Sequence, residues 1–207
     1  IGGGLLGLEA AVGLVKRGHK VTVFHRSNWL LNRQLDTESA QLLQNRLEGM
    51  GVQFRLGESP SSFLQSETGL VSHVVCQGGE LMPVDLVVMA AGISPEVRLA
   101  KKAGIDVNQA IVVDEKMKTS HPDVFALGEC CEFEQQTFGL VAPIWTQIKV
   151  LITVLSGEDG RFVIEPTPTK LKVSGVNLFS VGKIQPTEGD DCIFFKDVAA
   201  NHYRKLV

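Results

Sequence analysis

Three glycines with the spacing G-x-G-x-x-G stand at the start of the chain, at Gly2, Gly4 and Gly7. This spacing is typical of turns that bind a dinucleotide. The first glycine allows a tight turn, and the second lets the pyrophosphate approach bare backbone. The third lets the next helix pack closely on the sheet, and that helix directs its first N–H groups, near Leu5 and Leu6, at the phosphates. We therefore expect a nucleotide-binding turn here.

The residues expected near the adenosine ribose are basic. In dinucleotide-binding folds a carboxylate at the end of the second strand usually binds the ribose hydroxyls. Here His25 stands at that position and Arg26 follows, with Arg33 a few residues further on. Arginine can pair with a 2′-phosphate that an acid would repel, so the pattern favours NADPH or the use of both coenzymes. The alternative stays open, in which His25 and Arg26 are solvated and backbone contacts bind NADH.

One carboxylate, Glu9, follows the third glycine by two residues, and we place it on the first turn of the helix. Glu9 is either a surface carboxylate favoured by the helix dipole or a catalytic residue near the nicotinamide and the electron acceptor. Spacing alone does not decide between these two interpretations.

The elements that must position these residues alternate between strand and helix, which predicts an α/β fold with Rossmann-like, three-layer nucleotide-binding domains. A short β-rich unit is expected at the C-terminal end. In chain order, the sequence predicts helices over 5–17, 36–48, 96–103 and 143–155, and strands over 20–24, 52–56, 70–76, 85–92, 111–113, 124–127, 170–173, 178–181 and 192–195. Asp36 or Thr37 is the expected cap of the second helix.

The apolar run 85–92 is typical of a fully buried parallel strand, and its end, Ala91-Gly92, would let a ligand approach backbone. The run 124–127 is likewise expected to be a buried strand. The strand that should precede the glycines is reduced to Ile1. We therefore expect the sequence to be a fragment of a longer protein, cut at its C-terminal edge as well.

Composition excludes several functional classes. The net charge is −3 with no basic stripe, which argues against nucleic acid or an anionic membrane as partner. No apolar run approaches the length of about 18 residues that a membrane-spanning helix needs. The cysteines form no C-x-x-C motif and no metal site is expected, so free thiols in a reducing cytoplasm are favoured over a redox pair or cluster ligands. They are Cys76, Cys130, Cys131 and Cys192.

Three motifs together resemble the FAD-dependent pyridine nucleotide–disulfide oxidoreductases. They are the G-x-G-x-x-G-x-E opening, D-x-V-V-x-A-x-G over 85–92 and T-S-x-P-x-V-F-A-x-G-E over 119–129. In this family the chain passes from a first FAD half through an inserted NAD(P) domain and back into the FAD domain. The resemblance therefore implies an NAD(P) domain over 1–93, the second FAD half over 94–160 and the start of a β-rich domain over 161–207.

The same resemblance implies how FAD would be held. Glu129 stands where the family usually has aspartate, and it would bind the hydroxyls of the ribityl chain, with Gly128 allowing close approach. The helix that starts near Ala142, Pro143 and Ile144 would point its N-terminus at the N1/O2 edge of the flavin. Negative charge collects at that edge on reduction, and helix N–H groups stabilise an anion.

Four further stretches are similar to the large subunits of assimilatory NAD(P)H nitrite reductases. They are 33–36, 128–130, 139–143 and the lysine-rich 169–180, of which the last is the most specific. Cys131 and Gly182-Lys183 depart from that pattern. The iron–sulfur and sirohaem parts of such enzymes would lie beyond Val207.

The leading interpretation is the part of a nitrite reductase, a nitrate-assimilation enzyme, that passes a hydride from NAD(P)H to FAD. Its partners would be nucleotides and the redox domains of the parent chain, and a homodimer stays open. One alternative is a rubredoxin or ferredoxin reductase or an NADH oxidase-like flavoenzyme. Another is a module that binds NAD(P) without turnover. We expect the segment as printed to bind NAD(P)H but to hold FAD weakly or not at all.

Overall fold

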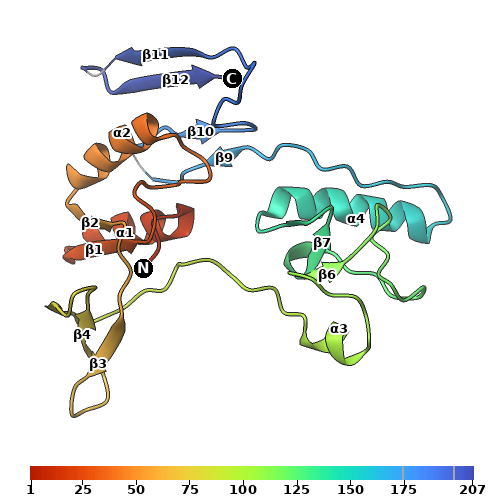
Figure 1. Ribbon diagram of the computed structural model, residues 1–207, viewed down its shortest axis with the longest axis horizontal. Coiled ribbons are helices and arrows are strands. Elements are labelled where there is room, and N and C mark those ends of the chain that lie inside the picture. Colours follow the sequence, from red (N-terminus) through yellow and green to blue (C-terminus); the bar gives the residue numbers. More distant parts are fainter. Residues whose placement is uncertain (174, 198) are drawn as a thin grey trace. The chain divides into compact units, whose positions relative to one another are not determined.

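A computed structural model describes residues 1–173, 175–197 and 199–207. Ser174, in the lysine-rich stretch, lies outside the described residues. The chain forms two compact units, one of residues 1–92 with 168–207 and one of residues 93–167 (Figure 1). Helices and strands alternate as predicted, so the α/β class is confirmed.

The first unit is built on a parallel pair of strands that helices cover on one face. Its first elements are α1 (Leu5–Val15), β1 (Val21–His25), α2 (Thr37–Glu48) and β2 (Val52–Leu56). The strands pair in register from Val21–Val52 to His25–Leu56. Val23 of β1 joins one buried cluster with Leu8 of α1 and Leu47 of α2. Both helices therefore pack on the face of the strand pair that Val23 occupies.

The other face of β1 is covered by an antiparallel sheet. Successive side chains of a strand point to opposite faces, and Phe24, next to Val23, packs with Val74 and Cys76 instead. That sheet has the order β3–β4–β5, with β3 (Ser62–Gln65), β4 (Val71–Val75) and β5 (Leu81–Pro83). The first unit thus has three layers, as predicted.

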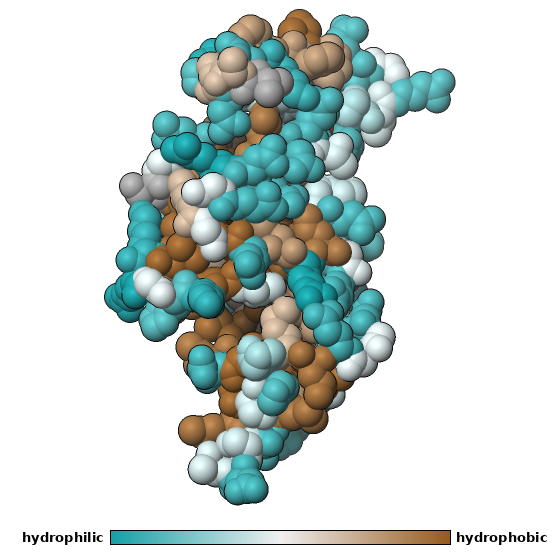
Figure 2. Space-filling view, turned by 90° about the vertical axis from the view of Figure 1, so that its left-hand side faces the viewer, coloured by the Kyte–Doolittle hydropathy of each residue, from teal (hydrophilic) through white to brown (hydrophobic). Residues whose placement is uncertain are grey.

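The prediction of a buried parallel strand over 85–92 is wrong. These residues form no strand, and Leu86 and Met89 are 68% and 64% exposed. Figure 2 shows hydrophobic residues gathered at the level of β3 and β4, in the lower part of the view. The physical reason is the lack of strand partners: within the described residues, the backbone hydrogen bonds of the segment to the rest of the chain are to Ile1, which donates to the Val88 carbonyl at 2.6 Å and accepts from the Ala90 N–H at 2.8 Å.

The C-terminal segment, residues 168–207, packs within the first compact unit. Leu171 and Val173 are buried in the same cluster as α1 and α2, at 5% and 6% exposure. The strands of this segment are β9 (Thr169–Lys170), β10 (Phe179–Ser180), β11 (Ile193–Asp197) and β12 (His202–Leu206). They form the antiparallel pairs β9–β10 and β11–β12, so the β-rich character predicted for this segment is confirmed.

Asp36 ties the β11–β12 hairpin to the start of α2. Its Oδ1 caps the helix by accepting from the Ser39 N–H at 2.9 Å, as predicted. Its Oδ2 accepts from the Tyr203 hydroxyl at 2.7 Å and from the Lys205 ammonium at 2.9 Å. Burial opposes ionisation, but these hydrogen bonds outweigh it and hold the pKa of Asp36 below its usual range.

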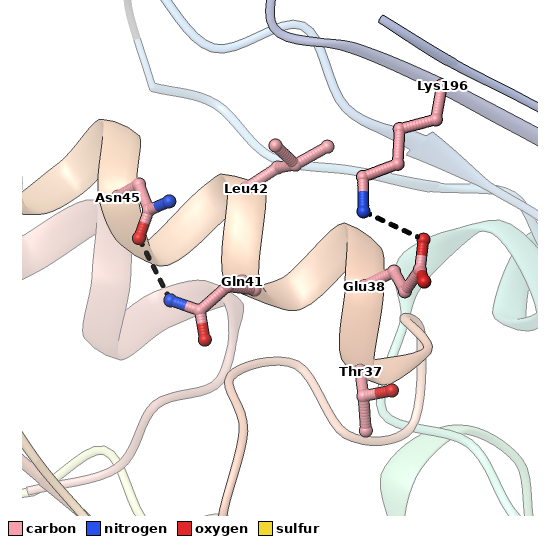
Figure 3. A pocket seen from close by; sticks show the side chains of 6 residues that line it. All are labelled: Thr37, Glu38, Gln41, Leu42, Asn45 and Lys196. Atoms are coloured by element: carbon pink, nitrogen blue, oxygen red, sulfur yellow. Dashed lines mark hydrogen bonds and ion pairs between the residues drawn. The ribbon is translucent and has the colours of Figure 1, made fainter. Parts of the chain in front are cut away.

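A second ion pair joins the hairpin to α2. The Lys196 Nζ lies 3.2 Å from the Glu38 carboxylate, across a hollow that Thr37, Gln41, Leu42 and Asn45 also line (Figure 3). Both groups are partly exposed, so the pair contributes little to stability next to the buried contacts of Asp36.

The second unit packs short strands on one long helix. Its elements are α3 (Arg98–Lys102), β6 (Ile111–Val112), the 3-10 helix η1 (Gly128–Cys130), β7 (Cys131–Phe133), β8 (Gln136–Thr137) and α4 (Val141–Leu155). Phe162 is the centre of its core and makes edge-to-face contacts with Phe133 and Phe138, with ring centroids 5.6 and 5.5 Å apart. α4 begins two residues earlier than predicted.

The prediction of a buried strand over 124–127 is also wrong. Phe125 makes only an isolated antiparallel bridge with Lys118, and Ala126 alone of the four is buried. The flanking sequence contains Pro122, which has no N–H to give to a ladder. The segment therefore runs as an irregular connection into η1.

We predict that Asp36→Ala lowers the free energy of unfolding by about 1–3 kcal/mol in urea denaturation, because it removes a cap and leaves Tyr203 and Lys205 without their acceptor. Asp36→Asn is the matched control, since it keeps a cap oxygen and loses the charge. Because the folded pKa is depressed, the wild type should lose this contribution as pH falls below about 4, the unfolded value. An equal acid sensitivity of wild type and Asp36→Asn would contradict the assignment.

Candidate functional site

The glycine-rich turn is held by backbone contacts that leave no room for side chains. A Cβ on Gly7 would lie 1.9 Å from the Gly2 carbonyl oxygen, and a Cβ on Gly2 would lie 2.2 Å from the Ala90 carbonyl oxygen. Gly2 also has a φ of 111°, which L side chains rarely adopt. The Gly2 N–H donates to the Phe24 carbonyl at 2.8 Å, which fixes the turn at the end of β1.

Gly4 differs from its two neighbours in the motif. It is the N-cap of α1, its φ of −86° suits any residue, and a Cβ there would meet nothing within 4 Å. Within the described residues no side chain caps α1, and its first turn carries no acid. The space in front of Gly4 therefore opens onto free helix N–H groups, including those near Leu5 and Leu6. This is the arrangement that binds a phosphate anion.

Gly3 carries a role that the motif does not predict. A Cβ on it would lie 2.8 Å from both the His25 ring and the Leu30 side chain. The Gly3 N–H donates to His25 Nδ1 at 3.1 Å, and the Gly3 carbonyl accepts from the Leu31 N–H at 3.0 Å. The only sequence signal was a fourth glycine, between the first two of the three that the motif requires.

The structure places His25, Arg26 and Arg33 at or just beyond the end of β1. His25 is half-buried, and burial first, then the charge of Arg26, lower its pKa, so the ring is neutral near pH 7. Arg26 and Arg33 are exposed, and neither forms an ion pair within the described residues. The loop that carries them is anchored by Leu30 and Leu31, which are 0% and 1% exposed. Two unpaired guanidinium groups thus stand on a firmly packed loop.

The structure gives Glu9 a backbone partner. Glu9 lies in the second turn of α1 rather than the first, and its carboxylate accepts from the Lys172 N–H at 2.9 Å. The contact links α1 to the lysine-rich stretch. It accounts for Glu9 as a structural carboxylate, while a catalytic role stays a prediction.

Of the two residues predicted at the end of 85–92, Ala91 lies beside the glycine turn, and Gly92 follows it with a backbone conformation that favours glycine. The Ala91 nitrogen lies 3.1 Å from the position of a Cβ on Gly2, and Gly92 has a φ of 107°. Ala90, which was not predicted as a site residue, makes the closest approach. Its backbone fills the space beside Gly2 that a side chain would need.

A second group of predicted residues lies in the other unit, around η1. Gly128 is buried with a φ of 85°, and its N–H donates to the Gln147 Oε1 of α4 at 2.8 Å. Gln147 is fully buried, and its Nε2 has no hydrogen-bond partner within the described residues. A buried donor without an acceptor is unfavourable by about 1–3 kcal/mol. The unsatisfied Nε2 of Gln147 therefore favours a polar ligand next to this side chain.

Glu129 and the start of α4 complete this group. Glu129 is exposed, and its carboxylate accepts no hydrogen bond from the described part of the chain. α4 has Leu140 as its N-cap, and it has neither a capping side chain nor an acid in its first turn among the described residues. The N–H of Ala142 therefore has no acceptor within the helix, Pro143 has no N–H, and Ile144 follows as the next residue of the helix.

The cysteines are all unpaired. Cys76 and Cys131 are buried, Cys130 is half-buried and Cys192 is exposed. Burial raises the pKa of Cys131 to about 12, which keeps it a thiol that donates to the Gly128 carbonyl at 3.3 Å. It therefore contributes to the structure of the turn rather than acting as a nucleophile.

Family models match most of the chain. A family model described as pyridine nucleotide-disulphide oxidoreductase matches residues 1–149, and one described as rubredoxin NAD+ reductase C-terminal domain matches residues 168–207. The assimilatory nitrate reductase electron transfer subunit of Bacillus subtilis (strain 168) is 40% identical over 208 residues, which is 100% of this chain and 27% of that protein. The NAD(P)H nitrite reductase of the same strain is also 40% identical over 208 residues, 100% of this chain and 26% of that protein.

Solved structures agree with the sequence comparison. A ferredoxin reductase from Rhodopseudomonas palustris is similar to 99% of this chain over 51% of its own, with a TM-score of 0.85 and 26% identity. The chain belongs to the pyridine nucleotide-disulphide oxidoreductase family, as its motifs predicted. It spans about a quarter of the length of the two Bacillus subtilis relatives. Among the described residues, no helix is long and apolar enough to cross a membrane.

We predict that three glycine-to-alanine changes separate binding from folding. Gly4→Ala should lower the free energy of unfolding by at most about 1 kcal/mol, because alanine is a poorer N-cap than glycine, and should weaken NADH binding at least about tenfold, because the methyl group fills the space for the phosphates. Gly7→Ala should destabilise the protein, because its Cβ meets a carbonyl oxygen. Gly13→Ala, in the exposed middle of α1 with open space around it, is the control and should stabilise by about 0.5–1 kcal/mol. Titration of NADH fluorescence and thermal unfolding measure the two effects. Normal NADH affinity in Gly4→Ala would contradict this placement.

Proposed function

We propose that this chain carries the coenzyme site and part of the flavin site of an NAD(P)H-dependent flavoprotein reductase, the reductase part of a nitrite reductase. The observation that supports this most strongly is the contrast within the glycine motif. Gly2 and Gly7 have no room for a side chain, whereas Gly4 faces open space at the uncapped start of α1. A merely structural turn would not need glycine at Gly4.

The residues present fit both cofactors. The turn and α1 would hold the pyrophosphate of NAD(P)H, with Arg26 and Arg33 near the adenosine ribose. Gly128, Glu129 and the start of α4 would hold the ribityl chain and pyrimidine edge of FAD, and Gln147 offers a buried donor. Bound together, the two cofactors supply hydride transfer from the nicotinamide to the flavin, and the protein binds and orients them.

The likeness to nitrite reductase extends along the whole chain, including the lysine-rich stretch 169–180. We therefore propose nitrite as the final substrate, with redox domains of the same protein as electron acceptors and the cytoplasm as the location. A rubredoxin or ferredoxin reductase is the second candidate, because residues 168–207 match the C-terminal domain of rubredoxin reductases. A module that binds NAD(P)H without turnover is the third.

Anaerobic mixing of the purified full-length protein with NADH or NADPH tests the proposal. A bound flavin should bleach, and nitrite should then restore its absorbance. Recovery with rubredoxin but not with nitrite would favour the second candidate. Tight NAD(P)H binding without bound flavin would leave the non-catalytic module as the remaining candidate.

We predict that Glu129→Ala lowers the flavin content per polypeptide while NAD(P)H binding stays nearly intact. A carboxylate accepts from ligand hydroxyls more strongly than a neutral group does, and the carboxylate of Glu129 accepts no hydrogen bond within the described residues. Glu158→Ala, an exposed glutamate in the same unit, is the control. Flavin absorbance and coenzyme titration measure the outcome. Unchanged flavin content with lower stability would show that Glu129 is structural.

We predict that Arg26→Ala weakens NADPH binding more than NADH binding. Loss of one charge-assisted contact to the 2′-phosphate should weaken NADPH binding by about 1.5–3 kcal/mol. Arg17→Ala removes an exposed arginine just beyond the C-terminal end of α1 and should change neither affinity. Dissociation constants of both coenzymes check this. Equal losses for the two coenzymes would favour a solvated Arg26.

A further inference from the structure

The N–H and the carbonyl of Gly3 both form hydrogen bonds with residues that follow Gly3 by more than twenty positions. Its N–H donates to His25 Nδ1, and its carbonyl accepts from the Leu31 N–H. The His25 ring also lies against the Gly3 Cα, so closely that no side chain fits there. His25 stands where related folds place a carboxylate for the ribose, yet its ring is directed at the protein's own turn.

The hydrogen bond defines the protonation state of the ring. An imidazole nitrogen accepts only when it carries no proton, so the neutral ring must hold its proton on Nε2. That Nε2 is buried and has no partner within the described residues. A protonated His25 would turn a second N–H toward the Gly3 N–H, and the hydrogen bond would be lost.

The charges around His25 are few. Arg26 is the charged side chain whose field acts on the ring, and it opposes protonation, as burial does more strongly; polar groups of Asn32 and Trp29 favour it. The first turn of α1 carries no acid. Glu58 donates its N–H to the His25 carbonyl, while its carboxylate lies 3.7 Å from Arg55. No carboxylate is therefore seen to stabilise a charged His25 within the described residues.

We propose that His25 is a positioning residue of the coenzyme site: its neutral ring holds Gly3, and with it the glycine turn, in the conformation that binds the pyrophosphate, and protonation of the ring releases the turn. The inference rests on the proposed function, because the turn must be a coenzyme site. His25 acts through Gly3 and does not itself have to touch the ligand. Coenzyme affinity then depends on pH through one residue of the protein.

The test compares wild type with His25→Asn and His25→Leu. Asparagine places an oxygen close to where Nδ1 stands and does not titrate between about pH 5 and pH 8. Leucine removes the acceptor. NADH is the probe, since NADPH has a phosphate monoester that itself titrates near about pH 6.

In the full-length protein, wild-type affinity for NADH should be constant near about pH 8 and fall about threefold to tenfold as pH drops below the usual histidine range. His25→Asn should match the wild type near about pH 8 and lose this fall. His25→Leu should bind NADH about threefold to tenfold more weakly at every pH. A pH profile of His25→Asn that matches the wild type would overturn the proposal, and so would full affinity in His25→Leu.

Hydrogen exchange of the Gly3 amide separates this inference from the proposed function, because it needs no coenzyme. The amide should be protected in wild type and His25→Asn at about pH 8, and unprotected in His25→Leu or at acid pH in wild type. Absence of binding of both NADH and NADPH together with this exchange pattern would refute the coenzyme site and leave the role of His25 in holding Gly3. Equal protection in all three proteins would overturn the role of His25. If His25→Leu does not fold, the loss of acid sensitivity in His25→Asn decides the question.

Discussion

The close approach of backbone to backbone at Gly2, Gly7 and Ala90 is the constraint on which the site depends. A carbonyl oxygen lies 1.9 Å from where a Cβ of Gly7 would stand, so α1 can begin only in direct contact with the turn that precedes it. This contact sets the direction of α1 and brings its free N–H groups to the end of β1. The same contact holds the segment around Ala90 beside the turn, although that segment pairs with little else.

The loop after β1 is fixed next to the glycine turn by buried side chains and by a backbone hydrogen bond. Leu30 and Leu31 are buried in the core beneath the loop, and Leu31 adopts a φ of 49°, which is uncommon for a side chain of its kind. That conformation lets the Leu31 N–H reach the Gly3 carbonyl. The loop is therefore held by apolar contacts, and neither of its exposed arginines, Arg26 and Arg33, forms an ion pair with the described part of the chain. Their charge remains available for a ligand, and less side-chain and loop order has to be gained on binding.

Local interactions could be predicted from the sequence, and long-range ones could not. The tight turn into α1 and the capping of α2 by Asp36 were correct because the interacting residues lie within a few positions of one another. The strand over 85–92 was wrong because burial of an apolar run depends on pairing partners from elsewhere in the chain. The burial of Leu171 and Val173 with α1 and α2 could likewise not be predicted, because these residues alternate with lysines and their contacts lie far away in the sequence. The pairing of His25 with Gly3 was missed for the same reason, since 22 positions separate them.

The helix N-termini distinguish a terminus that the protein caps itself from a candidate ligand-binding terminus, which residue spacing alone cannot do. α2 satisfies its own N-terminus with Asp36, a buried carboxylate that also binds the C-terminal hairpin. α1 and α4 have no capping side chain and no acid in the first turn within the described residues. Free N–H groups at a helix start are normally satisfied by a cap, by water or by a ligand. The two long helices without caps are the two that the glycine motif and the family resemblance assign to cofactors. An acidic side chain at the N-terminus of α1 or α4 would compete with phosphate or reduced flavin for the same N–H groups. The lack of such a side chain in the described first turns is therefore compatible with ligand binding at the N-termini of both helices.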